Sequence, residues 1–416
     1  MLKSCEIMNA NFKNLRRQIK DPLFKNSLFI ILSSAESAFF GFFFWFLAAK
    51  LYSAEAIGLA TAMISSLGLL NSISRLGFDQ SIIRFLPEMD RNRVFWTSAL
   101  FTALISAILG SIFLAFIEFF SPSLIALRDV FPLYILFLLF YSLTTTNSSL
   151  FIAIRKAEID FVQKMLLGSR IPLLIPLAFL GVFGIFFSVG FAYLIAIAFS
   201  LSFLILKLDL RFSGIDKDFL RRSFSFSTGN YVANLLGALP PMIMPIMVLN
   251  VLGAEQNAIY YIAYTIGAFV FIIPTSFGTS LFVEGSHGEP MRIKTKKSVF
   301  GIYALLLPSV LVIIFLGEYL LAFLGKHYEA GLTLLRVFAV SSLFAPFFSI
   351  YSTIKRVQKD LKGLIAVVFL LSSLLITLSY FLMLAYGING VGYAWLLSYA
   401  FCSVIIGLIA KKNRWI

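Results

Sequence analysis

Long apolar runs, separated by short polar segments, follow one another along the whole 416-residue chain. Most runs hold roughly 20 residues, the length that a helix needs to cross a hydrocarbon core of about 30 Å. Because lipid offers no partner to a backbone amide, such runs form helices. The pattern predicts an all-α integral membrane protein with about twelve transmembrane helices. The predicted spans are residues 27–49, 56–76, 95–117, 131–153, 165–184, 187–206, 224–251, 258–281, 299–321, 332–354, 363–385 and 389–410.

Weak internal matches recur at an offset of about 200 residues. Residues 154–158 match 354–358, and residues 190–193 match 390–393. Six helices are therefore followed by six more, and an even number gives both halves the same orientation in the membrane. We expect two parallel six-helix lobes with a central cleft. The expected divisions are a cytoplasmic tail at 1–26, lobes at 27–206 and 223–410, a cytoplasmic linker at 207–222 and a second cytoplasmic tail at 411–416.

Basic residues are distributed very unevenly between the two sides of the membrane. When the connecting segments are assigned alternately, 30 of the 34 Lys and Arg residues fall on the side of the N-terminus and three on the other. This bias predicts a multi-pass protein of the cell membrane with both termini in the cytoplasm. The assignment places Arg155 to Arg170 in one cytoplasmic segment and Lys355 to Lys362 in another. The net charge of +14 thus reflects topology, or contact with anionic headgroups, and not nucleic acid.

The second span carries small or polar residues on one helical face. They are Gly58, Thr61, Ser65, Gly68, Ser72, Arg75 and Asp79. This face either packs closely against another helix or lines the cleft. Arg75 and Asp79 are spaced i, i+4 near the cytoplasmic end, so they either pair with each other or border an inward-facing vestibule.

Other spans contain further candidates for substrate binding. Asn230 and Asn234 form a polar face on the seventh span, which prolines interrupt. Tyr260 and Tyr264 in the eighth span are either anchors at the membrane interface or rings that stack on sugars. Arg336 either extends outward to the headgroups or holds an anion in the cleft.

Glu36 lies about ten residues into the first span, where a carboxylate is costly unless it is protonated, paired or hydrated. It is either a coupling site for a proton or Na+ gradient or a buried acid satisfied by a neighbouring helix. No other cofactor is expected. The sequence lacks HExxH, paired CxxC, Walker and GxSxG motifs, and the outer loops are short, so we expect no enzyme.

Several segments resemble those of polysaccharide flippases of the multidrug/oligosaccharidyl-lipid/polysaccharide exporter superfamily. The principal match is the segment at residues 77–88, GFDQSIIRFLPE, directly after the second span. Residues 51–58, 277–284 and 387–394 also match, and the resemblance covers essentially the whole chain.

The resemblance implies a flippase that moves polyprenyl-pyrophosphate-linked oligosaccharide to the outer leaflet by alternating access, for cell-surface polysaccharide assembly. Its partners would be this lipid, the bilayer and other polysaccharide-assembly proteins. By position, Asp79 and Arg84 match the family segment and Arg75 precedes it by one turn, so these residues are expected near the pyrophosphate. The alternatives are a drug/cation antiporter of the same superfamily and a membrane-embedded glycan-assembly enzyme.

Overall fold

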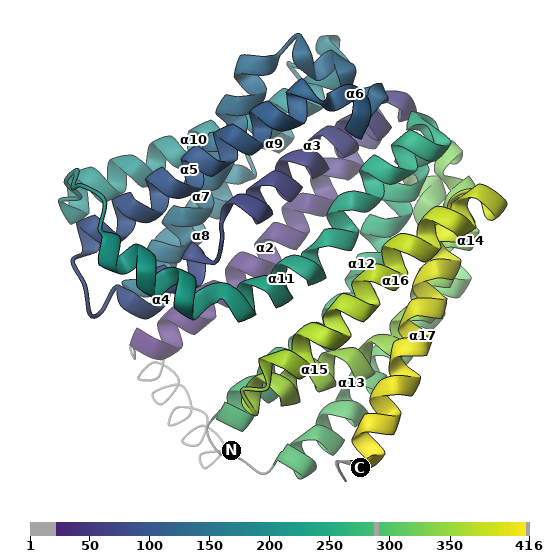
Figure 1. Cartoon of the computed structure of the whole chain (residues 1–416). Coiled ribbons are helices and arrows are strands. Elements are labelled where there is room, and N and C mark those ends of the chain that lie inside the picture. The colour runs from purple at the N-terminus through teal and green to yellow at the C-terminus, as the bar shows by residue number, and fades with distance from the viewer. Residues whose placement is uncertain (1–21, 287–290, 413–416) are drawn as a thin grey trace, which may run out of the picture.

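A computed structural model describes residues 22–286 and 291–412, and nearly all of these residues are helical (Figure 1). The predicted tail at residues 1–21 and the last four residues lie outside this range. No strand occurs within the part that the structure describes. The prediction of an all-α protein is therefore confirmed.

The first half of the chain forms six crossings with short accessory helices. Its elements are α2 (Pro22–Leu51), α3 (Ala54–Ser74), α4 (Phe78–Phe85), α5 (Arg91–Ala115), α6 (Ile117–Phe120), η1 (Pro122–Arg128), α7 (Phe131–Ala153), α8 (Ala157–Leu167), α9 (Arg170–Leu173), η2 (Ala178–Leu180) and α10 (Val182–Leu208). Local caps fix several of these starts. Ser53 accepts a hydrogen bond from the Ala56 amide at the start of α3, and Asp90 accepts one from Arg93 at the start of α5.

The second half repeats the order with longer helices. Its elements are α11 (Lys217–Leu252), α12 (Ala254–Ser286), α13 (Met291–Leu324), η3 (Lys326–Gly331), α14 (Leu332–Ser341), η4 (Ser342–Phe344), α15 (Ala345–Val357), α16 (Leu361–Tyr386) and α17 (Ile388–Lys412). Ten helices or runs of helices in the described residues are long and apolar enough to cross a membrane. The 30-residue α2 and the interrupted segment from α8 to η2 complete the twelve crossings.

The fifth crossing differs from its prediction, which placed a continuous span at 165–184. The chain instead crosses as α8, α9 and η2, beginning at Ala157. Pro172 and Pro176 cause the interruption, because each lacks a backbone N–H and its ring clashes with the preceding turn of a helix. The crossing therefore starts earlier in the sequence than its most apolar window.

The internal repeat is visible in the backbone. Arg155 and Lys359, which precede the fifth crossing of each half, have φ of 59° and 57°. Gly181 and Gly387, which follow that crossing, have φ of 56° and 57°. The structural partner of Arg155 is thus Lys359, one helical turn beyond the residue that the sequence match gave it.

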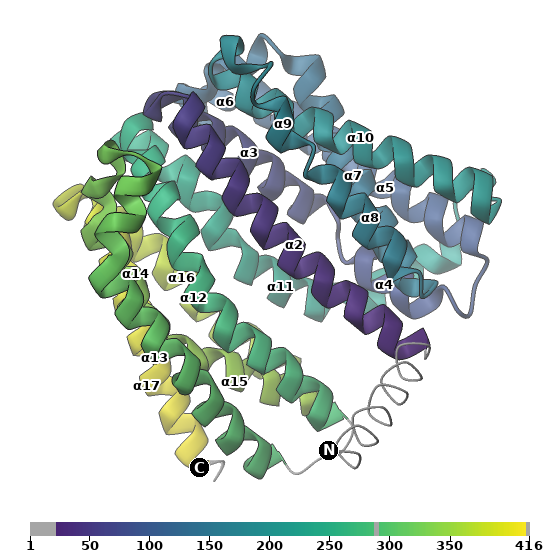
Figure 2. The same cartoon turned by 180° about the vertical axis from the view of Figure 1, so that it is seen from behind.

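The two halves form two lobes that lie side by side, with α3 and α4 of the first against α11 and α12 of the second (Figures 1 and 2). We call the end of the bundle where α2 begins and α17 ends the terminal side, and the opposite end the far side. The ribbons of the lobes diverge towards the terminal side. The sequence predicts that the terminal side is cytoplasmic.

The lobes meet tightly near the far side, at the starts of α3 and α12. A Cβ atom on Gly58 would lie 1.7 Å from the carbonyl oxygen of Ala254, so only glycine allows this approach. Asn257 donates from Nδ2 to the Gly58 carbonyl at 2.7 Å and to Thr61 Oγ1 at 3.1 Å. The polar face of the second span thus serves, at this end, to join the lobes.

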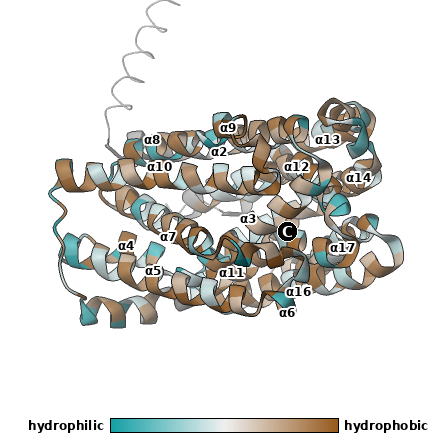
Figure 3. Cartoon of the chain, turned by 90° about the horizontal axis from the view of Figure 1, so that it is seen from above, coloured by the Kyte–Doolittle hydropathy of each residue, from teal (hydrophilic) through white to brown (hydrophobic). Residues whose placement is uncertain are grey.

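Hydrophobic residues dominate the long helices, and hydrophilic ones gather mainly at helix ends and connecting segments (Figure 3). Many large apolar side chains of α13 are exposed, as expected for a helix that faces lipid. The largest buried cluster combines residues of α2, such as Phe44 and Trp45, with residues of α12 and α14. Apolar packing therefore holds the lobes together beside the polar contact at Gly58.

Candidate functional site

Arg75 and Asp79 lie where α3 gives way to α4 on the terminal side. Leu76 and Gly77 have positive φ, of 45° and 82°, and they turn the chain between the two helices. Despite this turn, Arg75 Nη1 lies 3.5 Å from Asp79 Oδ2, and both side chains are about one third exposed. Arg75 Nε is buried without a hydrogen-bond partner, so the guanidinium is only partly satisfied.

The Arg75–Asp79 pair borders a small hollow between the lobes. Its other walls include Tyr231 and Asn234 of α11, and its volume is about 20 Å³. The Tyr231 hydroxyl donates to the backbone carbonyl of Ile73 at 2.7 Å, which ties α11 to α3 at this level. Asn230, one helical turn before Asn234, is half-buried on α11.

Asn234 also borders a second, larger cavity inside the C-terminal lobe. This cavity measures about 340 Å³ and lies between α11, α12, α15 and α16. Arg356 enters it from the last turn of α15 and donates from Nη2 to Asn234 Oδ1 at 3.1 Å. The other polar lining residues are Thr275, Thr279, Ser349, Ser352 and Thr353. A guanidinium surrounded by hydroxyl groups is suited to binding a phosphate.

The two other predicted arginines lie elsewhere. Arg84 ends α4 on the surface, where it pairs with Glu88, and about half of each side chain is exposed. Arg336 is exposed on α14, and its Nε donates to the backbone carbonyl of Ile314 at 3.1 Å. Neither arginine borders the hollow at Arg75 or the cavity at Arg356.

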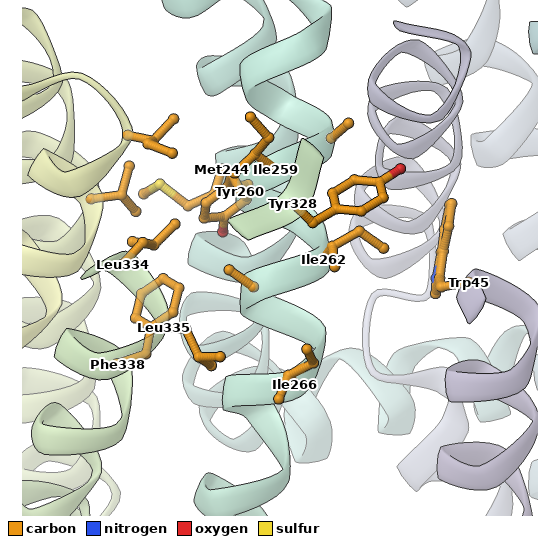
Figure 4. Close-up of a cluster of buried hydrophobic side chains, with 14 of the residues drawn as sticks. Trp45, Met244, Ile259, Tyr260, Ile262, Ile266, Tyr328, Leu334, Leu335 and Phe338 are labelled. Atoms are coloured by element: carbon orange, nitrogen blue, oxygen red, sulfur yellow. The ribbon is translucent and has the colours of Figure 1, made fainter. Parts of the chain in front are cut away.

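The two tyrosines of the eighth span have different surroundings. Tyr260 is fully buried among Met244, Ile259 and Leu334, and its hydroxyl has no hydrogen-bond partner (Figure 4). Tyr264 lies one turn further, with a ring-centroid distance of 5.9 Å from Tyr260. It borders a third cavity, which is described below. The structure thus places Tyr260 in the core and Tyr264 at a cavity wall.

Glu36 lies in the N-terminal lobe, on the face of α2 that packs against α8. Both carboxylate oxygens are buried and have no hydrogen-bond partner. The charges that act on it are those of Lys164 and Asp160 on α8. Lys164 Nζ lies 2.7 Å from Asp160 Oδ2, and Asp160, which is fully buried, also accepts a hydrogen bond from Ser148. Glu36 is therefore a carboxylate with free proton- or cation-binding capacity beside an ion pair that is already satisfied.

Arg170 is a site residue that the sequence analysis missed, because it assigned this residue to a cytoplasmic loop. The structure places it at the interruption of the fifth crossing, where α9 begins. Its guanidinium carbon lies 5.1 Å from the centre of the Phe44 ring, over the face of α2 that includes Gly41. Gly41 and Phe44 precede the far end of α2 by about 10 to 15 Å at the usual helical rise. Arg170 is therefore deep within the membrane-spanning bundle.

The surroundings of Arg170 are aromatic and uncharged. The phenol groups that act on it electrostatically belong to Tyr141 and Tyr193 of the same lobe and to Tyr261 of the other. The rings of Tyr141 and Tyr193 stack at 4.4 Å. Arg170 Nε is buried without a partner, and no ion pair joins this arginine to another described residue. The arrangement leaves a permanent positive charge available to an anion between the lobes.

Two signals in the sequence indicate Arg170. Gly168, Pro172 and Pro176 all fall inside one apolar window, which predicts a broken helix. An arginine beside such a break lies within the membrane rather than at its surface, and an ionisable residue at that depth is a functional candidate. Arg356 was missed because the sequence analysis assigned it to a cytoplasmic loop, whereas it lies in the last turn of α15.

Together these features are those of a multi-pass membrane transporter fold, with two six-helix lobes and polar groups between and inside them. The solved structures with this fold support that class. The chain matches an inward-facing MATE-family multidrug resistance transporter with a TM-score of 0.73, 14% identity and coverage of 91% of this chain and 94% of that one. It matches the lipid II flippase MurJ in an inward closed conformation with a TM-score of 0.73, 16% identity and coverage of 92% and 87%.

A third structure, that of the MATE multidrug transporter DinF-BH, matches with a TM-score of 0.66, 14% identity and coverage of 95% and 96%. No family model matches the chain. An uncharacterised membrane protein of Methanocaldococcus jannaschii is 23% identical over 370 residues, which is 80% of this chain and 84% of that one. The chain thus has the fold of these solved structures, which are two transporters and a flippase.

Proposed function

We propose that this protein is a flippase for a lipid whose head group is an oligosaccharide linked through pyrophosphate. It takes the head group from the terminal side, which the charge distribution predicts to be cytoplasmic, and releases it on the far side. The MurJ structure with the same fold is a flippase of lipid II, which supports a lipid substrate. The two MATE structures support the alternative of a multidrug antiporter.

Arg170 is the observation that carries the proposal. An arginine keeps its charge at every physiological pH, and a buried charge without a partner is costly. An anionic head group offsets that cost and gains bidentate hydrogen bonds. An organic cation would be repelled from the same position. The unpaired guanidinium between the lobes therefore favours an anionic lipid over a cationic drug.

Arg75, Arg356 and Arg170 lie at two levels of the bundle. Arg75 and Arg356 belong to the ends of α3 and α15 on the terminal side, whereas Arg170 lies in the far half of the bundle. A pyrophosphate cannot enter hydrocarbon without compensation. These guanidinium groups provide the compensating positive charge as the head group crosses the membrane, while the polyprenyl tail stays in lipid.

The test replaces Arg170 in the host organism after deletion of the gene. We expect deletion to abolish surface glycan and to raise the amount of completed lipid-linked oligosaccharide in the cytoplasmic leaflet. Arg170→Gln should restore export about 100-fold less well than the native gene, since hydrogen bonds to a charged group contribute about 1.5–3 kcal/mol. Arg170→Lys should restore part of it, because it keeps the charge but not the fork of donors.

Arg336→Gln is the matched control, because Arg336 lies in a crossing of the other lobe with its side chain exposed. It should export normally at the same protein level. Normal export by Arg170→Gln would contradict the proposal. Intact surface glycan in the deletion strain, together with greater sensitivity to cationic drugs, would establish the antiporter instead.

Glu36 is proposed as the coupling site. It has two free carboxylate oxygens in a crossing and takes no part in the Lys164–Asp160 pair. A proton or Na+ bound there would neutralise the carboxylate and change its attraction for Lys164. Coupling at Glu36 is compatible with either substrate, so it does not distinguish the flippase from the antiporter.

A further inference from the structure

The C-terminal lobe contains a third cavity, between α11, α12, α15, α16 and α17. Its volume is about 210 Å³, which is room for a single ring rather than for a whole oligosaccharide. Its walls include Gly237, Tyr264, Phe271, Phe348, Trp395 and Tyr399. No charged residue is among its lining residues.

Aromatic rings form most of one side of this cavity. The Trp395 ring centre lies 5.8 Å from that of Tyr264, 5.5 Å from that of Phe271 and 5.9 Å from that of Tyr399. The rings meet edge to face or tilted, so they hold one another in place. Such a rigid wall of tyrosine and tryptophan suits a ligand that is apolar on its face and polar at its edge.

The cavity also has polar groups in its walls. Pro240 and Pro241, which line it, remove the usual helical donors of the Leu236 and Gly237 carbonyls. Ser372, another lining residue, donates to the Leu236 carbonyl at 2.7 Å. Its hydroxyl oxygen can still accept a hydrogen bond from a ligand.

The cavity adjoins the polar one that contains Arg356, since Gly237 and Phe348 border both. A ligand extending from one to the other would place a ring against Trp395 and an anionic group near Arg356 and its surrounding hydroxyls. An organic cation would suit the aromatic rings alone. The guanidinium of Arg356 in the adjoining cavity would repel it.

We propose that this cavity binds the sugar ring next to the pyrophosphate of the transported lipid, and that the adjoining Arg356 cavity binds the phosphate. The ring stacks against Trp395 and Tyr264 and donates a hydrogen bond to the hydroxyl oxygen of Ser372. The inference rests on the proposed function for the identity of the lipid. It adds that the C-terminal lobe selects the first sugar of the head group.

Gly237→Leu is the decisive variant, because Gly237 borders both cavities and a leucine there narrows their junction without removing an aromatic ring. A Cβ at this position has only Val368 Cγ1 within 4 Å, at 3.8 Å, so the backbone accepts a side chain. Gly407→Leu is the matched control. A Cβ there meets nothing within 4 Å, and Gly407 borders a different cavity of the same lobe.

The measurement is calorimetric titration of the full chain in lipid nanodiscs. The probes are inorganic phosphate, tetraphenylphosphonium and the 1-phosphates of glucose, galactose, mannose and N-acetylglucosamine. We expect at least one sugar phosphate to bind about tenfold more tightly than inorganic phosphate, since one ring contact contributes about 1.4 kcal/mol. Gly237→Leu should abolish this preference and Gly407→Leu should keep it. Trp395→Phe, which replaces the indole with a smaller ring, should weaken it several-fold.

Binding of all four sugar phosphates no more tightly than phosphate would overturn the inference. So would a preference that survives Gly237→Leu, or binding of tetraphenylphosphonium that Gly237→Leu abolishes. This result is independent of the export test. If the protein prefers a sugar phosphate but its gene does not restore export, the sugar site is supported and the flippase function is contradicted. If the gene restores export but the protein shows no such preference, the flippase function is supported and the sugar site is contradicted.

Discussion

The two lobes have the same order of helices but bury different chemistry. The N-terminal lobe contains Glu36, the Asp160–Lys164 pair and Arg170 inside its crossings. The C-terminal lobe has aromatic rings and an uncharged cavity at the corresponding level. The same backbone repeat thus places charged groups inside the crossings of one lobe and a neutral, ring-sized cavity in the other, where Arg356 belongs to the adjoining cavity.

Residues at corresponding positions in the two lobes show this difference in buried chemistry. Glu36 and Gly237 each lie 15 residues before the last residue of their helices, α2 and α11. Arg170 lies between the positive-φ residues Arg155 and Gly181, and Leu375 lies similarly between Lys359 and Gly387. Both C-terminal counterparts, Gly237 and Leu375, border the uncharged cavity. Where the N-terminal lobe has the carboxylate of Glu36 and the guanidinium of Arg170, the C-terminal lobe has Gly237, Leu375 and the uncharged cavity.

Asp160→Asn should give the largest effect on folding. Asp160 is fully buried, and removing its charge leaves Lys164 without its partner, at a cost of about 3 kcal/mol. The thermal unfolding midpoint in detergent should fall clearly. Asp218→Asn breaks a similarly spaced pair with Arg222, which is more than half exposed, and should change stability by less than about 1 kcal/mol. Equal midpoints for the two variants would contradict the contrast between buried and exposed charge.

Glu36→Gln should remove the response to an imposed ion gradient while leaving the protein folded. The amide cannot exchange a proton, so transport in vesicles should fall to its gradient-free rate, a loss of about tenfold or more. Gly407→Ala, in the other lobe and outside the cavity at Trp395, should respond normally. A normal gradient response by Glu36→Gln would reject the coupling role, and a lost response in both variants would indicate general damage.

Trp395→Phe should change stability little. It removes a buried N–H that has no partner, which offsets the loss of ring volume, and we expect a net change within about 1 kcal/mol. The unfolding midpoint should therefore stay near the native value even though sugar-phosphate binding weakens. A large loss of stability would show that the indole contributes more to the fold than its unpaired N–H indicates.

Arg84→Gln should have the smallest effect. Arg84 pairs with Glu88 on the surface, and such exposed pairs contribute about 0–1 kcal/mol. Export and unfolding midpoint should both match the native protein. A strong export defect would show instead that the segment at residues 77–88 contacts the substrate, as the family resemblance implies.

The spans, the repeat and the two lobes could be predicted from the sequence, because apolar length and charge bias report directly on membrane crossing. The fifth crossing could not be placed by those criteria. A hydropathy window measures apolar content and ignores whether Pro172 and Pro176 allow a continuous helix. Since the window was centred too late, Arg170 was assigned to a loop although it lies within the bundle.

The candidate site was predicted only in part, for a similar reason. Glu36 and the Arg75–Asp79 pair were recognised because a charge within an apolar run is conspicuous. Tyr260 and Tyr264 have the same spacing signal, and Phe338 of α14 lies against both rings, at 6.4 Å and 6.1 Å between ring centres. Tyr260 is nonetheless fully buried in the core, whereas Tyr264 also meets Trp395 of α17 at a cavity wall. Which face of a helix meets a cavity depends on its neighbours, and these are set by the tertiary fold.

The contact between Gly58 and Ala254 holds the far side together through packing and through hydrogen bonds. Its directional part is the hydrogen bonding of one side chain, Asn257, to the Gly58 carbonyl and Thr61. Two such bonds contribute roughly 1–3 kcal/mol in net terms. One elementary charge moving through 100 mV gains about 2.3 kcal/mol. An ion that crosses under the proposed coupling at Glu36 therefore gains a free energy comparable with that of these two hydrogen bonds, while the apolar packing beside them must be offset by other interactions.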